Sequence, residues 1–222
     1  MEQQINNSKK LDLINLIAGA IVLFSAGLSL WFYPRLPARV PSHWDAAGQV
    51  NGYTTPLLAS LIWPGMLLAI FLLTWLLPKI DPKRANYRLM GKTYRVVRLY
   101  IMVCLAMVQF GSFQAAIGSG INMPGTVGLA VGLLLVVIGN YLGKVKHNYT
   151  FGLKTPWTLA NEDVWYKTHR AMGPLWVICG LMVAGSGFVP AALRIPLFIV
   201  ALGAMAGIPF VYSYWLYRRL EK

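Results

Sequence analysis

Six apolar stretches constrain this chain more than any other feature of its sequence. A helix needs about 20 predominantly apolar residues to cross the hydrocarbon core of a bilayer. Each stretch approaches that length, none has an Asp, Glu, Lys or Arg in its core, and the fifth can borrow a turn from the residues before it. The predicted spans are Leu11–Tyr33, Pro56–Leu77, Val96–Ile117, Gly125–Leu142, Gly173–Val189 and Ile195–Tyr217. The sequence therefore predicts an all-α integral membrane protein with six transmembrane helices.

The composition supports this class and argues against a water-soluble enzyme. Hydrophobic residues make up 57% of the chain and charged residues 12%, whereas soluble proteins are about one-quarter charged. Lys9 and Lys10 precede the first apolar stretch, as in a signal peptide. That stretch is too long, however, and it lacks a clean small-residue cleavage site. We therefore expect it to be retained as a span.

The basic residues lie in alternate connections between the spans. Lys and Arg number 20 and Asp and Glu number 7, which gives a net charge of +13. Seventeen of the twenty basic residues fall in the two tails, in the second connection with the start of the third span, and in the fourth connection. Because basic loops are retained in the cytoplasm, we expect both termini to be cytoplasmic. Six spans agree with this, since an even number of spans places both termini on the same side. The charge then faces anionic lipid, and no direct nucleic-acid binding is expected.

Small and polar residues inside the spans predict contacts between helices. Small-xxx-small spacing, which lets helix backbones approach closely, occurs in the pairs Gly128 and Gly132, Gly139 and Gly143, and Gly203 and Gly207. The main intramembrane polar groups are Gln109, Gln114 and Asn140, which we expect to form interhelical hydrogen bonds. Pro64 and Pro209 are expected to kink the second and sixth spans.

The first connection, residues 34–55, is predicted to be a short structured loop on the outer side. Pro37 and Pro41 fix their own φ and push the preceding residues towards extended backbone. The runs Asp45–Gly48 and Asn51–Gly52 carry turn chemistry. The pattern predicts an extended segment followed by tight turns, in the form of a small hairpin packed on the outer membrane face.

His43 is the residue of this loop that is best suited to bind a metal or a ligand. Only Asp45 is nearby in sequence, whereas a zinc site needs three or four ligands. We therefore favour a structural histidine, or one that recognises an extracellular ligand, over a metal ligand. Trp44 and Tyr53 are interpreted as anchors at the membrane interface.

The fourth connection, residues 143–172, is the longest polar one and is rich in aromatic residues. Thr158 or Asn161 can cap a helix that carries Glu162 and Asp163 in its first turn. The helical spacing of the following residues places them on one face: Val164, Trp165, Thr168 and Met172. The pattern predicts an amphipathic inner-loop helix. It either lies at the headgroup boundary and leads into the fifth span, or presents a docking surface to a cytoplasmic partner.

The chain carries no recognisable catalytic motif. Gly-x-Ser-x-Gly, His-Glu-x-x-His and the phosphate-binding Gly-rich loop are all absent from the sequence. We predict no enzyme activity, no cofactor and no metal. Two alternatives stay open: a small-molecule or lipid transporter or exporter, suggested by the Gly-rich spans and their polar residues, and an intramembrane enzyme that uses His43 or His147.

Motifs in both loops resemble one family. The run from Leu36 to Tyr53 resembles a domain of unknown function that is often fused to the SdpI family of bacterial membrane proteins. The inner segment resembles the C-terminal signature of the SdpI family itself. The residues that carry this resemblance are Asn140, Gly143, Asn148, Gly152, Leu153, the run Lys154-Thr155-Pro156-Trp157-Thr158-Leu159, Trp165, Arg170, Gly173 and Gly180. The sequence departs from the family pattern in having Lys154 in place of Arg and His147 in place of Pro.

The resemblance implies a multi-pass immunity and signal-transduction protein of the bacterial cell membrane. Such a protein gives resistance to a secreted antimicrobial peptide or protein toxin, and in the best-understood member it sequesters a cytoplasmic transcriptional repressor at the membrane. It further implies a two-span region, 1–95, and a four-span SdpI-like region, 96–222. Toxin-sensing residues are then expected at Arg39, Pro41, His43, Trp44, Gly48 and Tyr53. Partner-binding residues are expected at Asn148, Gly152, Lys154, Thr155, Pro156, Trp157, Thr158, Glu162, Trp165 and Arg170.

Overall fold

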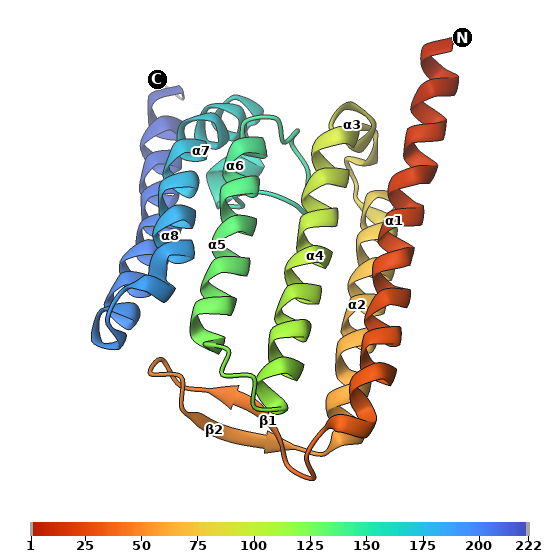
Figure 1. The fold of residues 1–222 in the computed structure, drawn as a ribbon. Coiled ribbons are helices and arrows are strands. Elements are labelled where there is room, and N and C mark those ends of the chain that lie inside the picture. The colour runs from red at the N-terminus through yellow and green to blue at the C-terminus, as the bar shows by residue number, and fades with distance from the viewer. Residues whose placement is uncertain (1, 221–222) are drawn as a thin grey trace. The chain divides into compact units, whose positions relative to one another are not determined.

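Six long apolar helices make up most of the protein. The computed structural model describes residues 2–220, with side chains described from residue 13 onward; Lys9, Lys10 and Lys222, which enter the charge argument, lie outside the described side chains. The six helices are long and apolar enough to cross a membrane (Figure 1). They are α1 (Glu2–Phe32), α2 (Pro56–Ile80), α4 (Gly91–Ala116), α5 (Met123–Leu142), α7 (Glu162–Ala184) and α8 (Ala191–Leu220). The six-span prediction is confirmed.

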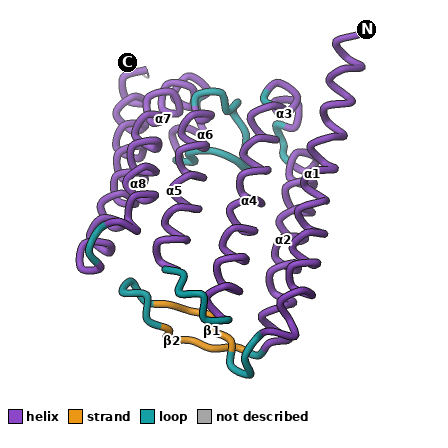
Figure 2. Tube along the Cα trace, in the orientation of Figure 1, coloured by secondary structure: helices purple, strands orange, loops and turns teal. Residues whose placement is uncertain are grey.

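Shorter elements occupy the connections. They are the 3₁₀ turns η1 (Tyr33–Arg35) and η2 (Gly185–Phe188), the strands β1 (Val40–Trp44) and β2 (Val50–Thr54), and the helices α3 (Arg84–Leu89) and α6 (Pro156–Ala160). Figure 2 shows the irregular segment between α5 and α6 as a long loop. Pro64, Pro174, Pro196 and Pro209 all lie inside helices that continue past them.

The chain divides into two compact units, each built from two stretches of sequence. The first comprises Met1–Trp75 and Arg98–Thr126, and the second comprises Leu76–Val97 and Val127–Lys222. Three helices, α2, α4 and α5, contribute residues to both units. The predicted division into regions 1–95 and 96–222 follows the family resemblance and stays a prediction.

The first unit packs around two apolar clusters. One joins Ala18, Leu67 and Met102, from α1, α2 and α4. The other joins the hairpin to these helices, because Val40 is buried together with Phe32, Ala59 and Phe113.

The predicted hairpin is present between α1 and α2. Strand β1 pairs antiparallel with β2, with Val40 opposite Thr54 and Trp44 opposite Val50. The turn is closed by Asp45, whose carboxylate accepts a hydrogen bond from the Gln49 N–H at 2.8 Å. Gly48 has a φ of +89°, a conformation that glycine adopts without steric cost. The turn chemistry of Asp45–Gly48 therefore ends β1 and starts β2.

Buried polar residues in the first unit connect α4 to α1. The Gln109 amide donates to the Ser25 carbonyl at 3.0 Å and to the Ser29 hydroxyl at 3.1 Å, which confirms its interhelical role. Arg98 is one of the seventeen basic residues that the sequence places outside the apolar cores, but its side chain is buried. Its guanidinium donates to the Asn15 side chain at 2.9 Å and lies over the Phe71 ring at 4.7 Å. An ionisable side chain is therefore buried within a membrane-spanning helix.

Glycines bring α5 and α7 into backbone contact in the second unit. A Cβ added to Gly139 would lie 2.8 Å from the Gly173 carbonyl oxygen and 2.8 Å from the Val177 nitrogen. A Cβ on Gly180 would likewise lie 2.8 Å from the Gly132 carbonyl oxygen. The prediction of close helix contact is therefore confirmed for the α5 glycines.

Two other sequence predictions about the second unit are wrong. A Cβ on Gly203 or Gly207 of α8 would meet no described atom within 4 Å, so neither glycine brings α8 close to another helix in the part of the chain that the structure describes. Asn140 is exposed and donates to the Val136 carbonyl of its own helix at 3.1 Å. It therefore bonds within α5 rather than to a neighbouring helix.

The predicted inner-loop helix is the beginning of α7. The Asn161 side chain caps it by accepting hydrogen bonds from the N–H groups of Asp163 and Val164, at 2.8 and 3.2 Å. The helix starts here rather than at Gly173, as the predicted cap allows. Its apolar face is buried inside the second unit, where Val164, Trp165, Thr168 and Met172 are all inaccessible. The interpretation of that face as one lying at the headgroup boundary is therefore wrong.

Candidate functional site

Residues 143–172, which we call the signature segment, fold around a buried asparagine in the second unit. Asn148 is fully buried, and its side-chain oxygen accepts hydrogen bonds from the N–H groups of Thr150 and Phe151 at 2.9 and 2.6 Å. Its amide donates to the Lys146 and Phe151 carbonyls at 2.8 and 2.7 Å. The asparagine thus holds the loop backbone in one turn, as buried polar groups must be paired.

A carboxylate and a phenol from the α2–α4 connection fix this turn. Buried Asp81 accepts a hydrogen bond from the Tyr149 N–H at 3.0 Å. The Tyr87 hydroxyl contacts Asp81 at 3.4 Å, Asn148 at 3.3 Å and the Thr150 hydroxyl. Burial raises the pKa of the Tyr87 phenol from 10.0 to about 12; the Thr150 hydrogen bond opposes this and the Asp81 charge adds to it. Tyr87 therefore stays a neutral hydrogen-bonding group.

A second polar contact joins α3 to the signature segment. The Lys83 ammonium lies 2.8 Å from Glu162 and 2.7 Å from the His147 Nδ1 atom. The Asn86 amide donates to the His147 carbonyl at 2.7 Å. His147 is buried and Glu162 is exposed. The His147 Nδ1 atom also lies 3.3 Å from the Glu162 carboxylate, so the three side chains form one polar cluster.

Trp165 and His169 form the floor of the segment. The rings are stacked, with centroids 4.1 Å apart, and the Trp165 indole donates to the Val145 carbonyl at 2.9 Å. His169 donates from Nδ1 to the Trp165 carbonyl at 2.8 Å and accepts at Nε2 from the Leu153 N–H at 2.9 Å. Both ring nitrogens are therefore used in packing the loop. The Gly152 backbone lies against these two rings with a φ of +129°, and a Cβ at this residue would lie 2.6 Å from the His169 Nε2 atom.

The Thr-Pro-Trp-Thr run attaches the segment to α8. Thr155 and Thr158 form a reciprocal capping box at the start of α6, and the Thr155 hydroxyl lies 2.9 Å from the Ser213 hydroxyl. Trp157 packs against Phe210 and Tyr214, with ring centroids 4.8 and 4.9 Å apart. Thr155, Trp157 and Thr158 therefore each make a distinct contact within the second unit.

The predicted partner-binding residues thus fall into two classes. Asn148, Thr155, Thr158 and Trp165 are buried, and Gly152 and Trp157 are half-buried. The exposed ones are Lys154, Pro156, Glu162 and Arg170. The first class holds the segment rigid, and the second is accessible to a partner.

In the first unit, the predicted toxin-sensing residues share one hairpin. His43 contacts the Asn51 side chain across the strands, which fits the structural role. Within residues 13–220 no three His, Cys, Asp or Glu side chains gather as a metal site. Arg39 lies over the exposed Tyr53 ring at 4.7 Å, and Trp44 is half-buried. Gly48 closes the turn.

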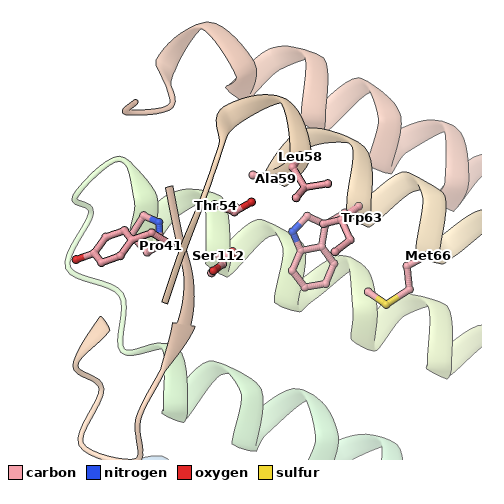
Figure 3. A pocket seen from close by; sticks show the side chains of 10 residues that line it. Pro41, Thr54, Leu58, Ala59, Trp63, Met66 and Ser112 are labelled. Atoms are coloured by element: carbon pink, nitrogen blue, oxygen red, sulfur yellow. The ribbon is translucent and has the colours of Figure 1, made fainter. Parts of the chain in front are cut away.

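A cavity of about 420 Å³ lies beside this hairpin (Figure 3). Pro41 and Tyr53 line it from the hairpin, together with Trp63 of α2 and Ser112 of α4. Sequence reasoning missed Trp63 and Ser112, because nothing local to either residue points to the hairpin.

Asp81, Tyr87 and His169 were also missed. Asp81 is the single acidic residue in the otherwise basic second connection, which was a usable signal. Trp165 and His169 are four residues apart on a helix, a spacing that places two rings on one face. Tyr87 has no comparable signal.

Comparisons with known proteins match both regions. The profile of the SdpI/YfhL protein family matches residues 144–213, and that of a domain of unknown function, DUF1648, matches residues 20–68. Over 209 residues the chain is 29% identical to the immunity protein SdpI of Bacillus subtilis (strain 168), covering 93% of this chain and 97% of that protein. The chain is thus similar to the SdpI/YfhL family in its C-terminal region, and to this immunity protein over nearly its whole length. No solved structure matches it.

The two matched segments contain the two structured regions. The SdpI segment runs from the loop through α6 and α7 into α8, and it includes both partners of the Thr155–Ser213 contact. The DUF1648 segment contains the whole hairpin and the first half of α2. With its six apolar helices, the chain is a multi-pass membrane protein in contact with lipid.

Proposed function

We propose that this chain is a membrane immunity protein that gives resistance to a secreted antimicrobial peptide or protein toxin. The observation that carries the proposal is its similarity to an immunity protein over nearly the full length of both chains. The hairpin supports it, since it offers an exposed, rigidly held surface formed by Arg39 and Tyr53. The absence of a catalytic motif from the sequence fits a binding protein rather than an enzyme.

The test is survival of toxin-sensitive cells that express the chain, challenged with a panel of secreted peptide toxins. Protection against at least one toxin is expected. Failure against every toxin, with the chain demonstrated in the membrane fraction by immunoblot, contradicts the proposal.

In this proposal the hairpin faces outward and both termini and the signature segment are cytoplasmic. Support comes from the distribution of basic residues, which are retained on the cytoplasmic side. Cysteine variants Ser42→Cys and Lys154→Cys, both at exposed positions, test it in whole cells with a membrane-impermeant maleimide. Labelling of residue 42 but not of residue 154 is expected, and the reverse pattern contradicts the orientation.

We further propose that the signature segment holds a cytoplasmic transcriptional repressor at the membrane. Support comes from the buried network, which fixes the exposed Lys154, Glu162 and Arg170 on a rigid base. In cells exposed to toxin, a fluorescent repressor is expected at the membrane with the parent chain and in the cytoplasm with Arg170→Glu. A repressor that is recruited equally by both chains contradicts a role for Arg170.

A transporter remains the alternative, because a second cavity of about 410 Å³ lies in the first unit. Ser29 and Ser60 line it, and Ser29 is bonded to Gln109. Flux of a small molecule or lipid across proteoliposomes that contain the purified chain would favour this alternative over immunity by binding.

A further inference from the structure

The cavity beside the hairpin has the size and the walls of a binding site. Its volume of about 420 Å³ lies within the range of about 300–1,000 Å³ that small-ligand sites occupy. The hairpin forms one wall, while α2 and α4 form the others. Trp63 is half-buried and packs on the cluster that holds Val40 and Phe113. This packing holds the indole ring in place at the cavity wall.

The walls suit a large apolar side chain. Trp63 supplies an aromatic wall and Met66 a flexible thioether, which adapts to irregular apolar shapes. The strand ends contribute Pro41 and Tyr53. Aromatic and methionine surfaces of this kind are typical of the pockets that hold anchor residues in protein interfaces.

Polar groups in the same walls favour a peptide over a lipid chain. Figure 3 shows the hydroxyls of Thr54 and Ser112 between the hairpin and Trp63. Hydrocarbon would leave these groups without hydrogen-bond partners, which costs free energy. A peptide backbone can pair with them. The sheet also has only two strands, so each strand keeps one unpaired edge of the kind that extended peptides bind.

A positive charge stands at the cavity wall. The Arg39 guanidinium lies over the ring of Tyr53, which lines the cavity. Among the described residues no carboxylate forms a salt bridge with Arg39. An acidic group on an incoming ligand would complement this charge and would make charge-assisted hydrogen bonds with the guanidinium.

We propose that this cavity receives one large apolar side chain of a secreted peptide, and that a neighbouring carboxylate of the peptide contacts Arg39. This inference rests on the proposed immunity function and names the chemistry by which the toxin is recognised. It assigns ligand contacts to Trp63, Met66 and Ser112, which lie outside the hairpin.

Adjacent residues of α2 provide a matched pair for testing the cavity. Ile62 lines it, whereas Leu61 lines the separate cavity beside Ser29 and Ser60. The two side chains are similarly exposed, at 54% and 59%, so that Ile62→Trp and Leu61→Trp should fold alike. Met66→Phe fills the same cavity from a different position. Equal thermal stability of the variants and the parent verifies folding.

The binding probe is a set of capped hexapeptides added to the purified chain in nanodiscs of phosphatidylglycerol and phosphatidylethanolamine. Each has Phe, Trp or Leu beside Asp, with controls that carry Ala for the large residue or Lys for Asp. Replacing the anchor by Ala should weaken binding about 10- to 100-fold, as loss of a buried large side chain implies. Ile62→Trp and Met66→Phe should weaken it similarly, and Leu61→Trp should not.

The charge is tested by a second matched pair. Arg39 and Arg35 each lie over an aromatic ring, at 4.7 Å from Tyr53 and 4.2 Å from Trp31, but only Tyr53 lines this cavity. Arg39→Gln should abolish the preference for Asp over Lys peptides, and Arg35→Gln should leave it in place.

The outcomes separate this inference from the proposed function. Protection of cells by the parent chain and equally by Ile62→Trp overturns the cavity site while immunity stands. Anchor-dependent peptide binding without any protection supports the site and contradicts immunity. Peptide binding that does not depend on the anchor overturns the site. A phospholipid that co-purifies with the parent and Leu61→Trp but not with Ile62→Trp also overturns it, and assigns the cavity to lipid.

Discussion

Alanine substitutions at two glycines of identical sequence spacing should have opposite effects on stability. Gly139 and Gly203 both belong to small-xxx-small pairs in apolar helices. A Cβ at residue 139 would lie 2.8 Å from the Gly173 oxygen and 2.8 Å from the Val177 nitrogen. Non-bonded atoms prefer separations of about 3.5–4.0 Å, and both neighbours are backbone atoms. The helices α5 and α7 must therefore move apart by about 1 Å to accept the methyl group.

The magnitude follows from the kind of contact. Overpacking of this type costs about 1–3 kcal/mol, so Gly139→Ala should lower the free energy of unfolding by that amount. At Gly203 no atom lies within 4 Å of the new Cβ, and the gain in helix propensity is at most about 1 kcal/mol. Gly203→Ala should therefore be neutral or stabilising. The two variants should differ by about 1–4 kcal/mol.

Reversible unfolding in mixed detergent and SDS micelles, followed by circular dichroism, measures the difference. Gly207→Ala is a second control, because its Cβ would also meet no atom within 4 Å. If Gly139→Ala proves as stable as Gly203→Ala, then the close approach of α5 and α7 is incorrect.

Three further predictions concern the signature segment and Tyr87, which contacts it. Gly152→Ala should unfold the loop around His169, seen as faster proteolysis of residues 143–172, because the added Cβ would lie 2.6 Å from the histidine Nε2 and the φ of +129° is strained for alanine. Trp165→Phe should cost about 1–3 kcal/mol of unfolding free energy, since the Val145 carbonyl loses its donor at 2.9 Å; an unchanged melting curve would contradict this. A native phenol pKa of about 12 against 10.0 means that the stabilisation from Tyr87 is fully present below pH 10 and is lost as the pH rises through 12. Tyr87→Phe should remove that loss from an alkaline unfolding series.

Features that depend on local pattern were predictable from the sequence. The six spans follow from apolar length, and the hairpin follows from prolines that favour extended backbone and from the turn at Asp45–Gly48. Asn161 is one of the two helix caps that the sequence predicts, the other being Thr158, because Asn followed by Glu162 and Asp163 satisfies both the capping and the dipole requirements. In each case the physical cause lies within a few residues.

Features that depend on distant partners could not be predicted in this way. Tyr87 and Asn148 meet although they are 61 residues apart in sequence, and no local periodicity relates them. Gly132 and Gly203 have the same spacing motif but opposite surroundings, since only the packing of other helices decides which face is covered. Arg98 has basic neighbours in sequence, and only the positions of Asn15 and Phe71 show that it turns inward.

The interleaved construction of the two units has a consequence for biosynthesis. Leu76–Val97 belongs to the second unit, but the rest of that unit begins at Val127. At about 5–20 residues per second, the ribosome needs about 3–13 s to pass from Tyr87 to Thr150. During that interval Asp81 and Tyr87 lack their partners at residues 148–150, and water or headgroups must take the place of those partners. The basic, polar character of this segment favours the membrane surface over the hydrocarbon core during that interval.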